Sequence, residues 1–148
     1  MNKGRRLASV AGTLGLGLAG VLVAGVGTAS ADTIGSSSNN QDICGYQLCL
    51  YYWNDAAGAM WASEDTQWSD LAGQTFVWGP TSSGGDGVNT PVKNHAQSAA
   101  NGGNYGVYIY VNSAGYGWGA YDYLPVDALG NLVTTWNNEA AYSIYYNG

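Results

Sequence analysis

The hydrophobic pattern beyond the first third of the chain consists of short apolar and aromatic runs separated by turn-forming residues. Two runs, 48–53 and 106–111, are rich in aromatic and β-branched side chains and lead into turns at 54–58 and 112–115. These features are typical of β-strands joined by tight turns. Each turn ends in a glycine, which we expect to take a positive φ.

Two further strands are predicted at 75–78 and 132–136 from their apolar and β-branched content. Apart from a single helical turn expected near 69–72, no stretch of useful length has a helical period. The pattern therefore predicts an all-β fold, built as a sandwich of two similar sheets.

The sequence also repeats itself. A shift of 57 residues aligns eight identical residues within a 32-residue window without a gap. The identical pairs are Gly45 and Gly102, Tyr51 and Tyr108, Ala57 and Ala114, Gly58 and Gly115, Trp61 and Trp118, Asp65 and Asp122, Asp70 and Asp127, and Gly73 and Gly130. Such self-similarity predicts two copies of one unit, at about 42–100 and 101–148. The first copy carries an extra segment, 79–91, whose Gly, Ser, Thr and Pro content predicts a loop.

The first 31 residues have the three parts of a secretory signal peptide. Three basic residues precede a long apolar run, which ends in the small-residue triplet 29–31. This order predicts cleavage between Ala31 and Asp32 and export of the domain 32–148. The run is long enough to anchor the chain in a membrane, but its many glycines and the cleavage triplet favour removal. We therefore expect a secreted, extracellular protein without a stable membrane anchor.

Charge narrows the range of partners. In 32–148 a single basic residue, Lys93, is set against ten acidic residues, which gives a net charge of −9 (1 − 10). Without a basic surface, the domain is not expected to bind nucleic acid or anionic lipid. The chain has 6 Trp and 12 Tyr, enough apolar area for a core, and we expect a monomer.

Cys44 and Cys49 are the only two cysteines. In an exported chain, an even number of closely spaced cysteines favours a disulfide. Closing so small a loop would add roughly 2 kcal/mol of stability. A metal-binding or redox pair is the alternative, but the spacing is not C-x-x-C and no second pair of zinc ligands is present.

Two motifs resemble known families. Residues 51–58 (Tyr-x4-Ala-x-Gly) and 108–115 (Tyr-x4-Ser-x-Gly) are similar to the aromatic-x4-aromatic-x-Gly hairpin signature of βγ-crystallins, although both lack the second aromatic. The start at 44–51 (Cys-x4-Cys-Leu-Tyr) and the element at 92–101 (Val-x-Asn-x-Ala-x-Ser-x-x-Asn) resemble the secreted peptidase-inhibitor family of actinobacteria, typified by a metalloproteinase inhibitor. The resemblance covers essentially all of 32–148. It implies a crystallin-like Greek-key sandwich that binds an extracellular protease.

One departure from that family concerns its inhibitory loop. In the inhibitory type, a second cysteine pair brackets the loop that enters the protease cleft, and the repeat places that pair at Asn101 and Gly106. The candidate inhibitory loop is therefore Asn101, Gly102, Gly103, Asn104, Tyr105 and Gly106. Since a rigid loop binds at little entropic cost, an unstapled Gly-Gly segment predicts weaker binding or the use of another loop, such as 79–91.

The alternative function is that of a crystallin-type calcium-binding or structural extracellular module. Crystallin-type calcium loops supply oxygen ligands in the pattern Asn/Asp-Asn/Asp-x-x-Ser/Thr-Ser. Residues 94–99 keep Asn94 and Ser98, and residues 137–142 keep Asn137 and Asn138. These degenerate patterns predict weak calcium binding or none, and no other cofactor is expected. The other interpretation is that these side chains close turns by bonding to local backbone.

An enzyme is not expected, because a hydrolase needs a nucleophile, a base and an orienting group. The single histidine, His95, has no partner set of that kind in the sequence. A third interpretation is a module that binds glycans or the cell wall, in which Trp53, Trp61, Trp118 and the tyrosines stack against sugars. Aromatic residues in strands more often pack between and over sheets, and the repeat-matched Trp61 and Trp118 are expected near the core.

Overall fold

The computed structural model describes residues 31–37, 44–77 and 85–148. The predicted signal segment up to residue 30, Trp78 and the first part of the predicted loop 79–91 lie outside these ranges. Within them the fold is all-β, as the sequence pattern predicts. The elements are β1 (Ala31–Thr33), β2 (Ser36–Ser37), β3 (Leu48–Tyr51), β4 (Met60–Ser63), β5 (Gln67–Trp68), β6 (Ser98–Ala100), β7 (Val107–Tyr110), the 3-10 helix η1 (Ala114–Tyr116), β8 (Tyr121–Leu124), β9 (Ala128–Asn131) and β10 (Ala141–Ser143).

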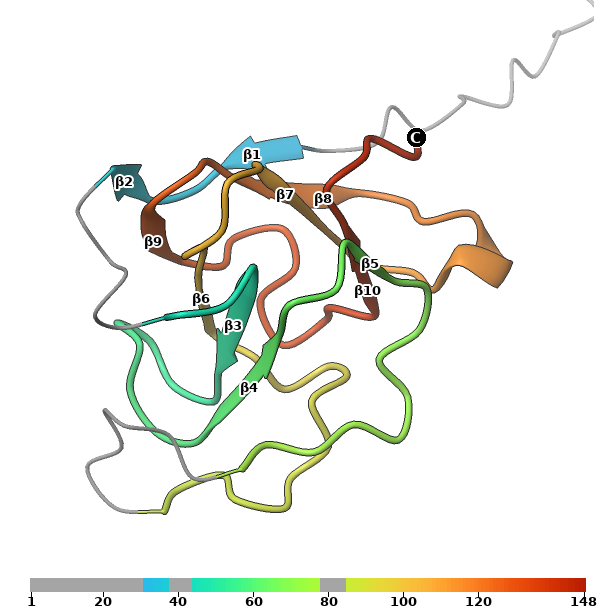
Figure 1. Ribbon diagram of the computed structural model, residues 1–148. Helices are drawn as coiled ribbons and strands as arrows, with labels where there is room; N and C mark the ends of the chain where they lie inside the picture. The colour runs from blue at the N-terminus through green and yellow to red at the C-terminus, as the bar shows by residue number, and fades with distance from the viewer. Residues whose placement is uncertain (1–30, 38–43, 78–84) are drawn as a thin grey trace, which may run out of the picture.

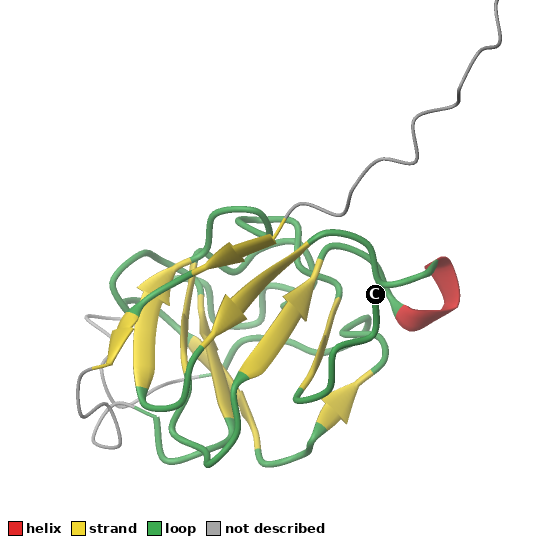
Figure 2. Ribbon diagram, turned by 90° about the horizontal axis from the view of Figure 1, so that it is seen from above, coloured by secondary structure: helices red, strands yellow, loops and turns green. Residues whose placement is uncertain are grey.

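The strands form two five-stranded sheets (Figure 1). The first, which we call the β7 sheet, has the order β1-β8-β7-β10-β5. The second, the β3 sheet, has the order β2-β9-β6-β3-β4. All pairings are antiparallel except that of β1 with β8. Figure 2 shows η1 in red, projecting from the body on the connection between β7 and β8.

The segments β3–β6 and β7–β10 build equivalent halves. In each half the first two strands form a hairpin, and the fourth strand pairs with the first. The third strand leaves its own half: β5 pairs with β10, and β9 pairs with β6. Each half therefore completes the sheet of the other, so neither sheet is whole without both halves.

The strand registers relate the two halves by offsets other than 57. Tyr51 and Tyr110, which end β3 and β7, are 59 positions apart, whereas Met60 and Tyr121, which begin β4 and β8, are 61 positions apart. The gap-free shift is therefore wrong as a structural alignment: the offset is already 59 at β3 and β7, and the second hairpin's connection, two residues longer, raises it to 61 at β4 and β8.

The offset of 59 also decides which glycine has a positive φ. Gly58 does so in the first hairpin, with φ 78°, as expected. Gly115 does not, because it lies within η1. The positive φ falls instead on Gly117, with φ 83°, which caps η1 and is 59 positions from Gly58.

Several predicted elements have different limits in the structure. The strands predicted at 48–53 and 106–111 are shorter, and the turn near 69–72 is not helical. Residues 75–77 make only isolated bridges, and 132–136 form bends and a turn. The last segment is not a strand because its N–H groups bond to a side chain. The carboxylate of Asp122 accepts hydrogen bonds from the backbone N–H groups of residues 133–135 at 2.9–3.1 Å, and from the Thr135 hydroxyl at 2.6 Å.

The main core lies between the two sheets. Alternate residues of β3 and β7 point into it: Leu48 and Leu50 from one sheet, Val107 and Ile109 from the other. Trp61 belongs to this core, whereas its repeat mate Trp118 is half-buried outside it. Tyr142 is also buried there, and burial raises the pKa of its hydroxyl to about 12.

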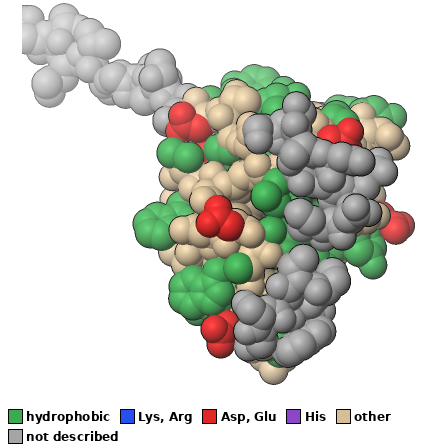
Figure 3. All heavy atoms as spheres, turned by 90° about the vertical axis from the view of Figure 1, so that its left-hand side faces the viewer, with side chains coloured by type: hydrophobic (Ala, Val, Ile, Leu, Met, Phe, Trp, Pro, Cys, Tyr) green, Lys and Arg blue, Asp and Glu red, His purple; other side chains and the backbone are tan. Residues whose placement is uncertain are grey.

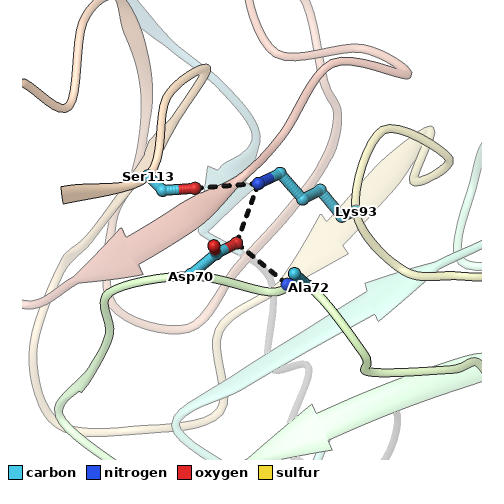
Figure 4. A network of polar contacts seen from close by, with 4 residues as sticks. All are labelled: Asp70, Ala72, Lys93 and Ser113. Atoms are coloured by element: carbon cyan, nitrogen blue, oxygen red, sulfur yellow. Dashed lines mark hydrogen bonds and ion pairs between the residues drawn. The ribbon is translucent and has the colours of Figure 1, made fainter. Parts of the chain in front are cut away.

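The single basic residue of 32–148 is used to join the two halves. The Nζ of Lys93 lies 2.8 Å from the Oδ1 of Asp70 and donates a 2.8 Å hydrogen bond to the Ser113 hydroxyl, as Figure 4 shows. The Ala72 N–H also donates to Asp70. The hydrogen bond from Lys93 is the main reason that the pKa of Asp70 is lowered. The contact fixes the connection after β7 against the first half.

Candidate functional site

The two segments that precede β3 and β7 lie side by side at one end of the sandwich. One is the disulfide loop 44–49, whose last two residues belong to β3, and the other is the candidate inhibitory loop 101–106; we call them the paired loops. The Gly102 N–H donates a 3.1 Å hydrogen bond to the carbonyl of Tyr46, which joins one loop to the other. Each loop leads into the first strand of its half, so the repeat brings both to the same place.

The loop 44–49 is closed by the predicted disulfide. Cys44 and Cys49 are bonded, with their Cα atoms 5.9 Å apart, which confirms the pairing. Both are buried, and they pack with Tyr51, Met60 and Ala100 in a second apolar cluster on the outer face of the β3 sheet. The base of this loop is therefore fixed both covalently and by packing.

The loop 101–106 is held by the side-chain amide of Asn101. This side chain is fully buried. Its Nδ2 lies 2.8 Å from the carbonyl oxygen of Tyr105, and 3.3 and 3.0 Å from those of Leu124 and Pro125. Its Oδ1 accepts a 3.0 Å hydrogen bond from the Gly103 N–H. One amide thus ties the beginning of the loop to its end and to the end of β8.

Gln47 extends this network from the other loop. Its Nε2 donates to the Tyr105 carbonyl at 2.8 Å and to the Oδ1 of Asn101 at 3.2 Å. The Tyr105 carbonyl therefore has donors from both paired loops. Because the Asn101 side chain is buried, leaving its amide without partners would cost about 1–3 kcal/mol, which favours the loop conformation that supplies them.

Gly102 and Gly103 lie close to the neighbouring disulfide loop. A Cβ added at Gly102 would lie 1.7 Å from the Cys44 carbonyl oxygen, and one added at Gly103 would lie 2.2 Å from the Gln47 side chain. The close approach of the paired loops requires glycine at 102, because the added Cβ would clash with backbone, whereas at 103 it would meet the flexible end of the Gln47 side chain.

The exposed part of the paired loops is aromatic and uncharged. Tyr105 is 58% exposed and Tyr46 is 42% exposed, and Asn104 is exposed as well. No charged residue occurs in either loop. No pocket opens among the described residues, so this end presents protruding side chains and no cavity for a small ligand.

The candidate calcium residues lie elsewhere, where the two halves meet before β6 and β10. The Asn94 N–H donates to the Glu139 carbonyl at 2.9 Å, and the Asn137 N–H donates to the Ala96 carbonyl at 2.8 Å. Asn94 and Asn137 both have positive φ, 67° and 52°. The structure thus brings these two segments together as a symmetric pair of turns.

Ser98 is committed to a structural role. Its hydroxyl donates a 2.6 Å hydrogen bond to the Trp53 carbonyl and accepts one of 3.0 Å from the Ala56 N–H. These bonds hold the β3–β4 connection against β6, so Ser98 bonds to backbone far along the chain and not to the local backbone that the turn-closing interpretation predicted. Asn138 lies exposed in the second turn. Within the described residues, no group of three His, Cys, Asp or Glu side chains is placed to hold a metal.

Sequence reasoning missed Glu139, which lies in the second of these turns. It is fully buried, and its Oε1 accepts hydrogen bonds from the N–H groups of His95 at 2.9 Å and Ala96 at 2.8 Å. Its Oε2 is buried without a hydrogen-bond partner. Burial raises the pKa of this carboxyl to about 8, against the opposing effect of the backbone donors. In the sequence, a single glutamate beside two asparagines gives no sign that it is buried, so its burial is seen only in the folded structure.

The remaining predicted residues are spread over the molecule. Ala31 and Asp32 lie in β1, where Asp32 accepts a 2.8 Å hydrogen bond from the Thr134 hydroxyl. The ring of His95 contacts the Lys93 carbonyl at 2.9 Å. Trp53 is 42% exposed and packs edge-on against Tyr52. These residues do not converge on one site.

Comparison with known proteins leaves the function to be argued from this geometry. No family model, no curated protein and no solved structure matches the chain. Across the described ranges, no helix has the length and apolar character needed to cross a membrane.

The buried carboxyl of Glu139 predicts an unusual pH dependence of stability. Because its folded pKa is raised above the usual value of 4.5, the folded state holds the proton more tightly, so stability falls as the pH rises towards 8. We expect the free energy of unfolding to fall by about 2–3 kcal/mol between about pH 6 and pH 9. In Glu139→Gln, which stays neutral, this fall should disappear. Denaturant titrations at several pH values measure it.

The matched control is Glu64→Gln, since Glu64 is exposed. That variant should keep the pH dependence of the wild type. If the wild-type stability were constant across the same range, Glu139 would be ionised in the folded protein, and the account of its burial would be wrong.

Proposed function

We propose that the protein is a secreted binding protein of the peptidase-inhibitor type with a crystallin-like Greek-key fold, and that it acts by presenting the paired loops to an extracellular protease. The strand order supports the fold assignment, because in each half the fourth strand returns beside the first, as in a Greek key. The exchange of the third strands makes the two halves one sandwich. A disulfide is compatible with an oxidising, extracellular environment.

The observation that carries the proposal is the hydrogen-bond network at the base of the loop 101–106. An inhibitory loop must be exposed at its tip and fixed at its base, since binding then costs little ordering entropy. Here the base is the buried amide of Asn101, and the tip is the exposed pair Asn104 and Tyr105. The neighbouring disulfide loop supplies Gln47 as a second support. The amide network takes the place of the second cysteine pair.

The side chains at the tip indicate the class of target. Tyr105 and Tyr46 offer large, rigid aromatic anchors of the kind that dominate protein interfaces. Neither loop has a Lys or Arg, so a trypsin-like specificity pocket, which needs a cation, has nothing to bind. We therefore propose a target with an apolar specificity pocket, such as a thermolysin-like or subtilisin-like enzyme.

The test is inhibition of a protease panel by the mature domain 32–148. We expect thermolysin-like or subtilisin-like activity to fall at micromolar inhibitor and trypsin-like activity to persist. Tyr105→Ala should weaken inhibition by about tenfold or more, because truncation of an aromatic anchor typically costs at least 1–2 kcal/mol. Progress curves with a peptide substrate give the inhibition constants.

The control is Tyr116→Ala, which removes an even more exposed tyrosine from η1. This variant should inhibit as the wild type does. A mature domain that leaves every apolar-specific protease fully active at micromolar excess, while being folded by circular dichroism, would refute the proposal.

Calcium binding is the second candidate function, and one observation favours it. The unpartnered Oε2 of Glu139 lies in the turn 137–139, which is bonded directly to the turn 94–96. Oxygen is the ligand atom that calcium prefers. Calcium at this position would hold Glu139 ionised and would supply the missing partner of its Oε2.

Calcium should then raise the melting temperature of the wild type, because a ligand of the native state stabilises it. Millimolar calcium should have no such effect on Glu139→Gln. Scanning calorimetry with and without calcium measures both. An unchanged wild-type melting temperature would exclude this function and leave the inhibitor proposal intact.

A further inference from the structure

We propose a glycan-binding surface on the outer face of the β7 sheet, separate from the paired loops. The alternation of β7 and β8 creates this face. Val107 and Ile109 point into the core, so Tyr108 and Tyr110 point outward. On β8, Asp122 and Leu124 are buried, so Tyr121 and Tyr123 point outward beside them.

Two more aromatic residues complete what we call the tyrosine face. It consists of Tyr108, Tyr110, Tyr121, Tyr123, Tyr146 and Trp118. Tyr146, from the segment after β10, lies over the strands, with its ring centroid 5.6 Å from that of Tyr108 and 5.4 Å from that of Tyr121. Trp118 packs on Tyr110 at 4.9 Å. The face is therefore one continuous set of rings.

Tyr108 lies at the centre of the set. Its ring centroid is 5.4 Å from that of Tyr121 and 4.9 Å from that of Tyr123. The segment after β10 is fixed in place, because the Asn147 N–H donates a 2.8 Å hydrogen bond to the hydroxyl of the buried Tyr110. Tyr146 is 54% exposed and Tyr121 and Tyr123 are partly exposed, so ring surface is available to a ligand.

The strand neighbours of these tyrosines carry no charge. Along β1, Thr33 lies beside Tyr123. Along β10, Ala141 and Ser143 lie beside Tyr110 and Tyr108, respectively, and both are buried; Gln67 of β5 pairs with Ser143 and is exposed. The acidic residues of this sheet lie on its other side: Asp122 is buried, and Asp32 bonds to Thr134. The face is aromatic, neutral and rich in hydroxyl groups.

These properties fit a neutral polysaccharide better than another protein surface. An apolar protein partner would bury the tyrosine hydroxyl groups without hydrogen-bond partners, which costs free energy. A carbohydrate presents both the apolar faces of its sugar rings and many hydroxyl groups, so it satisfies both properties of tyrosine. A polyanion is disfavoured by the net charge of −9 calculated above for residues 32–148. Figure 3 views the molecule from the left-hand side of Figure 1, and this side shows acidic side chains but no Lys or Arg.

The ring orientations narrow the form of the glycan. The planes of Tyr108 and Tyr121 meet at 70°, those of Tyr108 and Tyr146 at 53°, and those of Tyr121 and Tyr146 at 67°. Because the rings are not coplanar, they do not make a flat platform for a crystalline surface. The rings instead present their faces and edges in several directions, which suits a single, soluble glycan chain.

The test is isothermal titration of the mature domain with neutral hexasaccharides: cellohexaose, laminarihexaose and chitohexaose, with polygalacturonate as the anionic comparison. We expect binding of at least one neutral hexasaccharide and none of polygalacturonate. Tyr121→Ala and Tyr146→Ala should each raise the dissociation constant of the glycan by about tenfold. Trp136→Ala is the matched control, because Trp136 is 51% exposed and lies outside the tyrosine face; its affinity should match that of the wild type.

Two results would overturn the proposal. One is the absence of binding by all three neutral hexasaccharides at millimolar concentration. The other is binding that Tyr121→Ala and Tyr146→Ala leave unchanged, since the glycan would then occupy another surface. Tyr146→Ala should retain full protease inhibition, so a failure of this proposal is distinguishable from a failure of the inhibitor function.

Discussion

The side-chain amide of Asn101 is the interaction on which the proposed binding end depends. It is fully buried, and it joins the start of the loop 101–106 to Tyr105, to the end of β8 and, through Gln47, to the disulfide loop. A buried amide must satisfy its donors and acceptor or lose free energy, so one loop conformation is strongly selected. In this protein one half secures its loop with a disulfide and the other half secures the equivalent loop with an amide.

The exchange of third strands explains why two short, glycine-rich halves form one stable sandwich. Since β5 completes the sheet of the second half and β9 that of the first, each half depends on the other. Polar contacts reinforce the arrangement: Lys93 links the first half to Ser113, and Asp122 holds the segment 133–135. This scaffold leaves two surfaces free for function, the paired loops at one end and the tyrosine face on the β7 sheet.

Sequence patterns predicted the parts of the fold that depend on local composition. The β3 and β7 runs, the disulfide and the duplication are visible because aromatic and β-branched residues, paired cysteines and repeated letters mark them. The strand limits at 75–78 and 132–136 were wrong, since tertiary hydrogen bonds decide them, such as those to Asp122. The close packing of Gly102 against the disulfide loop could not be predicted, because close approach between loops cannot be inferred from either loop alone. The buried state of Glu139 depends in the same way on a partner segment far along the chain.

The central claim is that the amide of Asn101 immobilises the loop 101–106, and amide hydrogen exchange tests it most directly. In the wild type the N–H groups of Gly102 and Gly103 are bonded to Tyr46 and Asn101, so the account predicts that both exchange slowly. In Asn101→Ala their exchange should accelerate by at least about tenfold, while the amides of β3 stay protected. Rapid exchange at both glycines in the wild type, or protection unchanged in Asn101→Ala, would contradict the account.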